Sequence, residues 1–340
     1  MAGKRVWAAL TVLVGIATTA AALAGLAWRE LHAPLPVTTE TAWLRIPSGT
    51  PFHRVAADLA ARGLVDQPWL LAVYARATGD ATRIRAGEYQ LTAGTTPLTL
   101  IEKLVKGDVY LHEITIVEGS RFAEALAALR SHPAIAATEL DGAAIMAALG
   151  APGVHPEGQF FPDTYRFAFG TTDIAVLRIA HEALVARLQA VWRNRTADGM
   201  LKNDYEALIL ASIIEKETAL ASERRLIAGV FHERLRRNMR LQTDPTVIYG
   251  LGAAFDGNLR RQDLERDTPY NTYTRAGLPP TPIALPGAEA LEAAVSPELN
   301  GAVFFVATGR GDGSHYFSAT LEQHEEAVRN YLRELRSPER

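Results

Sequence analysis

An uncharged run of 23 residues at positions 6–28 places the strongest constraint on how this chain can fold. As a helix rising about 1.5 Å per residue, it would be about 34 Å long, enough to cross the hydrocarbon core of a bilayer. Lys4 and Arg5 precede the run, and positive charge on a short tail favours keeping that tail in the cytoplasm. We therefore expect a cytoplasmic tail at 1–5, a single transmembrane helix at 6–28 and an extracytoplasmic remainder.

A cleaved signal peptide is the alternative interpretation of the same run. Ala22-Leu23-Ala24 resembles a small-x-small cleavage site. However, the apolar core of a signal peptide usually spans about 7–15 residues. The greater length of this run favours a retained anchor.

The composition excludes several classes of protein. With 48% hydrophobic and 21% charged residues, the chain is not disordered. One long apolar run is too few for a polytopic transporter, and a net charge of -3 offers no basic field for nucleic acid. The absence of cysteine excludes disulfides, thiol catalysis and Cys-zinc sites. The motifs of P-loop enzymes, serine hydrolases and zinc peptidases are also missing, so we expect no metal and no other cofactor.

The remainder of the chain indicates an α+β fold. Residues 29–41 are rich in Pro and Thr and indicate a linker. After it, short strands are followed by Gly-containing turns and by helices that Ser or Thr can cap. The expected strands are 43–46, 88–91, 113–117 and a hairpin of 302–306 with 315–317; the expected helices are 52–61, 97–104, 122–129, 134–149, 173–193, 203–218, 222–237 and 322–335. Strands and helices alternate without regular βαβ repetition, which favours α+β.

The most apolar helix outside the N-terminal run ends in two carboxylates, Glu215 and Glu217. Asn203 and Glu206 form a plausible capping box at its start. Glu217 continues an apolar stripe at helical spacing, whereas Glu215 points about 200° away from it. A carboxyl at the end of such a stripe loses hydration, and this raises its pKa towards that of a useful acid. A salt-bridged helix end is the competing interpretation.

Three other segments concentrate aromatic and polar side chains. They are Glu157 to Tyr165, Gln242 to Thr246 and Tyr270 to Tyr273. Aromatic rings stack on the CH faces of sugars, while amides, hydroxyls and carboxylates bond to their hydroxyl groups. Together the segments favour a saccharide cleft.

These segments resemble the endolytic murein transglycosylase (YceG-like) family. The matching stretches are EGQFFPDTY at 157–165, ASIIEKET at 211–218, MRLQTDPTVIYG at 239–250, YNTYTRAGLPP at 270–280 and HYF at 315–317. The resemblance implies a LysM-like wall-binding module at 42–110 and a catalytic domain at 111–340. It implies cleavage of peptidoglycan between N-acetylmuramic acid and N-acetylglucosamine, leaving 1,6-anhydro ends. Termination of nascent strand elongation and penicillin-binding synthases as partners are implied in the same way.

The resemblance also implies roles for particular residues. The essential glutamate of the family lies within 211–218, and we choose Glu217, with Glu215 as the second candidate. Substrate-binding roles carry over to Glu157, Gln242, Asp244, Asn271 and Tyr273. Two alternatives stay open: a hydrolytic muramidase that pairs Glu217 with Asp244 or Glu157, and a wall-binding scaffold without activity.

Overall fold

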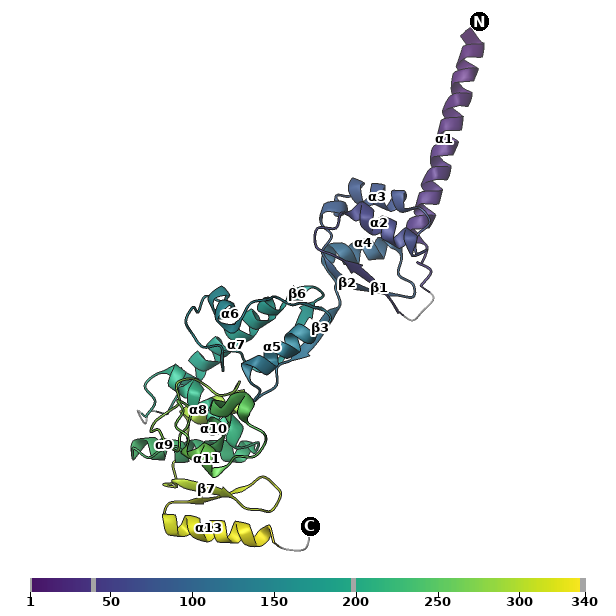
Figure 1. Ribbon diagram of the computed structural model, residues 1–340. Coiled ribbons are helices and arrows are strands. Elements are labelled where there is room, and N and C mark those ends of the chain that lie inside the picture. Colours follow the sequence, from purple (N-terminus) through teal and green to yellow (C-terminus); the bar gives the residue numbers. More distant parts are fainter. Residues whose placement is uncertain (1, 38–40, 197–199, 337–340) are drawn as a thin grey trace. The chain divides into compact units, whose positions relative to one another are not determined.

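The computed structural model describes residues 2–37, 41–196 and 200–336 (Figure 1). The chain divides into two compact units. Unit 1 comprises residues 1–112 and 166–171, and unit 2 comprises residues 113–165 and 172–340. Helices and short strands occur in both units, so the predicted α+β class is confirmed.

Unit 1 is a two-stranded antiparallel sheet whose apolar face packs on helices. Strand β1 (Thr41–Ile46) pairs with β2 (Gly87–Thr92), with Leu44 opposite Tyr89. Side chains alternate between the two faces of a strand, and Leu44 and Tyr89 are both buried in the core of this unit. The remaining elements are α2 (Phe52–Ala61), α3 (Pro68–Ala77), the 3-10 helix η1 (Asp80–Thr82) and α4 (Pro97–Lys106).

Helix α1 (Ala2–His32) precedes this sheet, and its last turn joins the core of unit 1 through Leu31. The expected linker at 29–41 is therefore helical as far as His32. Within the part of the chain that the structure describes, no helix reaches the length and hydrophobicity of a membrane span, so the helix expected at 6–28 is not confirmed. The side chains at 1–6, 8, 9 and 12, and residues 38–40, lie outside the described residues.

Two further strand pairs follow. Strand β3 (Leu111–Thr115) pairs with β5 (Thr164–Ala168), and β4 (Ile135–Ala136) pairs with β6 (Thr171–Thr172). Helix α5 (Phe122–Ser131) lies between β3 and β4 in sequence.

The single helix expected at 134–149 is wrong, because the segment contains β4 and the short helix α6 (Gly142–Ala148). The buried carboxylate of Asp173 accepts hydrogen bonds from the backbone N–H and the hydroxyl of Thr138, each at 3.2 Å. Asp141 accepts the backbone N–H of Ala144 at 2.8 Å and caps α6 at its N-terminus. Such side-chain bonds to the backbone compete with a continuous helix.

Helix α8 (Asp204–Glu217) runs through the core of unit 2. All residues from 207 to 214 are buried, so its apolar surface is not confined to one stripe. The helices α7 (Asp173–Arg193), α9 (Ala221–Arg236), α10 (Asp244–Leu251) and α12 (Ala288–Val295) contact it. Asn203 caps it by accepting the backbone N–H of Glu206 at 2.9 Å, whereas the Glu206 carboxylate bonds the N–H of Lys202.

The C-terminal part of unit 2 is a hairpin covered by a helix. Strands β7 (Phe304–Ala307) and β8 (His315–Ser318) pair antiparallel, so the predicted hairpin is confirmed, and α13 (Leu321–Glu334) packs against it (Figure 1). Helix α11 (Arg261–Glu265) and the 3-10 helix η2 (Gly252–Ala254) complete the unit between α10 and α12.

Candidate active site

The C-terminus of α8 places the carboxyl of Glu217 in a half-buried position in unit 2. Thr243 donates a hydrogen bond from its hydroxyl to this carboxyl. Burial raises the pKa of Glu217 from its ordinary value of 4.5 to about 7; the Thr243 bond opposes the rise, Asp244 adds to it and Arg234 opposes it. A carboxyl with such a pKa can both give and accept a proton near neutral pH.

A buried group of threonines fixes the hydroxyl that faces Glu217. The backbone N–H of Thr243 donates to the hydroxyl of Thr272 at 3.0 Å, and the hydroxyl of Thr246 donates to the carbonyl of Thr243 at 2.8 Å. The hydroxyls of Thr246 and Thr272 lie 2.9 Å apart. The polar segments predicted at 242–246 and 270–273 therefore meet behind Glu217.

A cavity of about 170 Å³ opens beside Glu217, and we call it the Gln242 cavity. Three of the predicted substrate-binding residues, Gln242, Asp244 and Tyr273, line it with Glu217. The Tyr273 hydroxyl donates to Asp244 at 2.6 Å, and burial followed by the bond to Asp244 raises the pKa of Tyr273. The cavity thus combines a carboxyl, an amide, a phenol and a second carboxylate, which suits a ligand rich in hydroxyl groups.

Arg234 supplies a buried positive charge to the same cavity. Its guanidinium donates to the backbone carbonyl oxygens of Val303 at 2.6 Å and Leu241 at 2.7 Å, and to the side chain of Gln242 at 3.3 Å. Within the described residues no carboxylate lies within ion-pair distance of it. The charge therefore acts on Glu217 from a fixed position, and it favours the ionised form of that carboxyl.

A second cavity, of about 420 Å³, lies on the other flank of the α8 terminus and is called the Glu215 cavity. Glu215 accepts the backbone N–H of Gly287 at 2.9 Å and lies 3.7 Å from a guanidinium nitrogen of Arg224. Burial raises the pKa of Glu215, while the Gly287 bond and Arg224 lower it. Glu217 lines this cavity as well.

Two predicted binding residues do not line either cavity. Asn271 is fully buried and donates its side-chain amide to the carbonyl oxygens of Leu264 and Arg266, at 3.0 and 2.7 Å. Glu157 is buried as well, and it accepts the backbone N–H of Phe122 at 2.8 Å. Burial raises the pKa of Glu157. In the structure both side chains support the backbone of neighbouring segments.

Sequence reasoning missed three side chains at this site. Thr243 lies inside a segment that was singled out, but nothing local marked its hydroxyl as the partner of Glu217. Arg234 lies on a helix of mixed composition, and Phe305 lies on a short apolar strand. Both line the Gln242 cavity only because the hairpin β7–β8 folds back towards α9.

Comparison with known proteins gives consistent matches over most of the chain. The model of the YceG-like family matches residues 44–330. The endolytic murein transglycosylase of Bacillus subtilis strain 168 is 31% identical over 311 residues, covering 85% of this chain and 84% of the relative. The protein of the same name from Streptococcus pneumoniae strain D39 is 27% identical over 321 residues; the match covers 84% of this chain and 58% of that relative.

A solved structure agrees with these matches. The crystal structure of a putative YceG-like protein from Listeria monocytogenes superposes with a TM-score of 0.55 at 28% sequence identity. The superposition covers 84% of this chain and 98% of the Listeria chain.

Proposed function

Because this chain belongs to the YceG-like family, we propose that it is a peptidoglycan lytic transglycosylase whose acid and base is Glu217. The observation that carries the proposal is the position of one carboxyl with a pKa of about 7 at the edge of two cavities. The relatives named endolytic murein transglycosylase support the reaction class.

The surroundings of the two glutamates favour Glu217 over Glu215 as the proton donor. A donor must hold its proton near neutral pH, and burial raises the pKa of Glu217 to about 7. Burial raises the pKa of Glu215 as well, but a backbone N–H at 2.9 Å and the guanidinium of Arg224 at 3.7 Å both favour its ionised form. We assign Glu215 a positioning role at the neighbouring cavity.

The reaction needs only one carboxyl because the attacking group belongs to the substrate. Glu217 donates its proton to the glycosidic oxygen as the bond from C1 of the muramic residue breaks. The 6-hydroxyl of the same residue then bonds to C1, and its proton passes to the Glu217 carboxylate. The product is a 1,6-anhydro end and no water is consumed. Because the intramolecular nucleophile is already positioned, this reaction does not require a second catalytic carboxylate.

Other residues of the Gln242 cavity support this sequence of events. Gln242 is exposed at the cavity, with Arg234 on its side-chain oxygen, so its amide nitrogen is available to the N-acetyl group of a sugar. Arg234 and the Thr243 hydroxyl stabilise the Glu217 carboxylate between the two proton transfers. Asn271 and Glu157 form hydrogen bonds to the backbone of neighbouring segments and do not contact the substrate.

Cleavage of uncrosslinked glycan strands by the full chain in detergent tests the proposal. We expect Glu217→Gln to lower the rate by about a thousandfold or more, since it removes the proposed proton donor. Glu215→Gln is the matched control and should retain measurable cleavage. An unaltered rate in Glu217→Gln with loss in Glu215→Gln would reverse the assignment. Unaltered rates in both variants would overturn both assignments, and no cleavage by the wild-type chain would favour a wall-binding scaffold.

A hydrolytic muramidase is the second candidate, because Asp244 is an exposed carboxylate in the same cavity as Glu217. Hydrolysis would use Asp244 to activate water or to attack C1. The two reactions differ in the mass of their products, since an anhydro end lacks one water. Mass spectrometry of the released strands therefore distinguishes them, and an unmodified reducing end would overturn the transglycosylase mechanism.

We also propose the cellular setting. Residues 6–28 anchor the protein in the cytoplasmic membrane with the catalytic domain outside, the segment 42–110 binds the wall, and the enzyme ends the elongation of strands made by penicillin-binding synthases. Supporting observations are the uncharged N-terminal run and large apolar side chains exposed on α1, such as Leu13 and Ile16. Cosedimentation with purified peptidoglycan and copurification with the synthases test the last two statements.

A further inference from the structure

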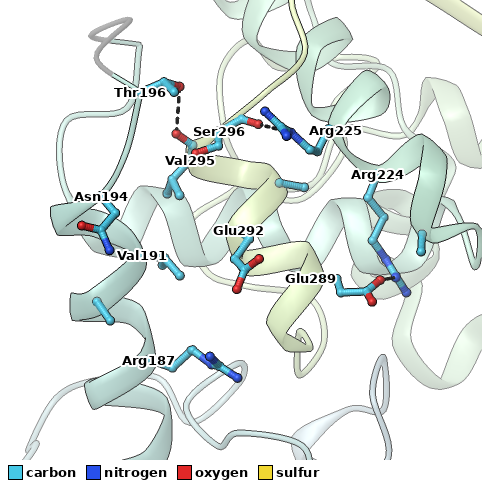
Figure 2. A pocket seen from close by; sticks show the side chains of 13 residues that line it. Arg187, Val191, Asn194, Thr196, Arg224, Arg225, Glu289, Glu292, Val295 and Ser296 are labelled. Atoms are coloured by element: carbon cyan, nitrogen blue, oxygen red, sulfur yellow. Dashed lines mark hydrogen bonds and ion pairs between the residues drawn. The ribbon is translucent and has the colours of Figure 1, made fainter.

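A third and larger cavity, of about 620 Å³, lies in unit 2 between the helices α7, α9 and α12. Figure 2 shows the side chains that line it, including Arg187 on α7, Arg225 on α9 and Glu292 on α12. We call it the Arg187 cavity. None of its polar groups takes part in the reaction described above.

Shared lining residues connect this cavity to the site of cleavage. Arg224 lines both the Arg187 cavity and the Glu215 cavity, and Glu217 lines both the Glu215 cavity and the Gln242 cavity. The Arg187 cavity is therefore a neighbour of the Glu215 cavity, which in turn is a neighbour of the Gln242 cavity, with the proposed acid between the last two.

The Arg187 cavity offers both signs of charge to a ligand. Arg187 and Glu292 are exposed in it, and neither forms an ion pair with another described residue. Arg225 uses its Nε on the carbonyl oxygen of Ser296 at 2.8 Å, which fixes the guanidinium at the rim (Figure 2). Buried apolar side chains, among them Val191 and Val295, line the cavity between these charges.

Arg224 adds a buried polar group where two of the cavities meet. It is only 9% exposed and pairs with Glu289 on α12 and with Glu215 on α8. Its Nε nonetheless has no hydrogen-bond partner within the described structure. Because a buried donor without a partner is costly, this nitrogen indicates that a ligand oxygen belongs at the junction.

From these features, and resting on the proposed function, we propose that the Arg187 cavity binds the peptide that branches from the glycan strand. Such peptides carry carboxylates, backbone amides and a free amine, together with short apolar side-chain segments, which we call the stems. Arg187 and Arg225 fit the carboxylates, Glu292 fits the amine, and the apolar wall fits the stems. In an intact strand the lactyl carboxyl groups of the glycan are consumed in the amide bonds to these peptides, so the charges that could meet these groups lie on the peptides. An extended peptide spans about 3.3–3.6 Å per residue, so four or five residues extend well beyond one sugar subsite.

The test compares cleavage of two strand preparations, one carrying its peptides and one from which an amidase has removed them. The variant is the double substitution Arg187→Gln with Glu292→Gln. On peptide-bearing strands we expect KM to rise about fivefold to tenfold with kcat nearly unchanged, because exposed charge pairs contribute to binding rather than to the chemical step. On peptide-free strands the variant should equal the wild type.

A matched control uses the same two changes elsewhere on α7, Arg193→Gln with Glu182→Gln, both exposed and outside the cavity. It should leave both substrates unaffected, and circular dichroism should show the same fold for all proteins. Equal KM values for variant and wild type on peptide-bearing strands would overturn the inference. An equal rise on both substrates would also overturn it, since the cavity would then contact the glycan.

A binding measurement separates this inference from the proposed function. Titration of wild-type protein with a synthetic tetrapeptide that carries two carboxylates and one amine should give saturable binding that the double variant loses. Binding without cleavage of any strand would overturn the proposed function and retain the peptide site. Cleavage of strands without binding of the tetrapeptide, and without the KM effect, would retain the function and overturn the site.

Discussion

At the scale of single residues, the chemistry depends on the proton affinity of Glu217. Burial makes the ionised form costly, while Thr243 and Arg234 stabilise it. The balance gives a pKa of about 7, so that near neutral pH the carboxyl is populated in both its protonated and its ionised form. A group that must donate a proton and then recover one is well served by this value.

Replacement of Thr243 by valine should change the pH dependence of cleavage. The hydroxyl bond favours the carboxylate, so its loss raises the pKa of Glu217. The alkaline limb of the pH–rate profile should then move to higher pH by roughly half a pH unit to one pH unit. The maximal rate should fall. Thr243→Ser keeps the hydroxyl and should retain the wild-type limb. An alkaline limb at the same pH in the valine variant would contradict the role given to Thr243.

The same pKa shift should appear in the stability of the protein. Because the folded state raises the pKa of Glu217 from 4.5 to about 7, the folded protein binds more protons than the unfolded chain in this interval. The free energy of unfolding must therefore fall as the pH rises from 4.5 to 7. Partial exposure reduces the full linkage value, and we expect a contribution on the order of 2 kcal/mol.

Urea unfolding at pH 5 and pH 7.5 measures that contribution. Glu217→Gln cannot ionise, so its stability should decline less over the interval than that of the wild type. Parallel declines in the two proteins would show that another group is responsible.

At the scale of secondary structure elements, α8 positions the acid because the helix is buried and because it ends at Glu217. Eight consecutive buried residues leave the helix no freedom to rotate, and the chain leaves the helix directly after Glu217 at Thr218. Helix α9 and the hairpin β7–β8 are joined by Arg234, which donates to the carbonyl of Val303. The cavity beside Glu217 therefore depends on two consecutive helices, α8 and α9, and on a hairpin that is distant from them in sequence.

The N-terminal cap of α8 offers a test of stability that leaves the chemistry untouched. Asn203→Ala removes the acceptor of the Glu206 N–H and should lower the free energy of unfolding by about 1 kcal/mol. The rate of strand cleavage at 25 °C should be unchanged, since the folded population remains close to complete. Asn203→Asp preserves the cap and should show wild-type stability. A loss of kcat in the alanine variant would indicate that the cap also positions Glu217.

At the scale of the whole molecule, the proposed anchor decides where the enzyme works. Three threonine hydroxyls in α1 donate to backbone carbonyl oxygens three or four residues earlier, for example Thr18 to Val14 at 3.0 Å. These bonds satisfy hydroxyl groups that, without a hydrogen-bond partner, would be costly to place in a hydrocarbon environment. They support the proposal that residues 6–28 lie in the membrane.

Extraction of membranes with alkaline carbonate tests the anchor. The full chain should stay in the membrane pellet, whereas Leu13→Arg with Ile16→Arg should weaken insertion, because each arginine costs about 2.5–3.5 kcal/mol near the bilayer centre. Substitution of two exposed surface residues in unit 2, such as Arg193→Gln with Glu182→Gln, is the control and should leave the distribution unchanged. Release of the unaltered chain by carbonate would overturn the anchor.

The sequence alone determined most of the elements of this protein. The helices 52–61 and 173–193 were predicted with the boundaries observed, and the hairpin near the C-terminus was predicted to within two residues. Local signals suffice there, since apolar periodicity, capping residues and turn glycines act over a few positions. Clustering of polar and aromatic residues also pointed to the segments 242–246 and 270–273, which meet at the site, whereas the third predicted segment, 157–165, lines neither cavity beside Glu217.

Only the tertiary structure decided which of those residues face one another. It placed Thr243 and Arg234 against Glu217, directed the amide of Asn271 into the backbone, and broke the helix expected at 134–149 through the carboxylate of Asp173. The physical reason is that these contacts join residues as many as 35 positions apart. Their geometry, and the pKa that follows from burial, arise when α8, α9 and the hairpin pack together, and no local pattern contains that information.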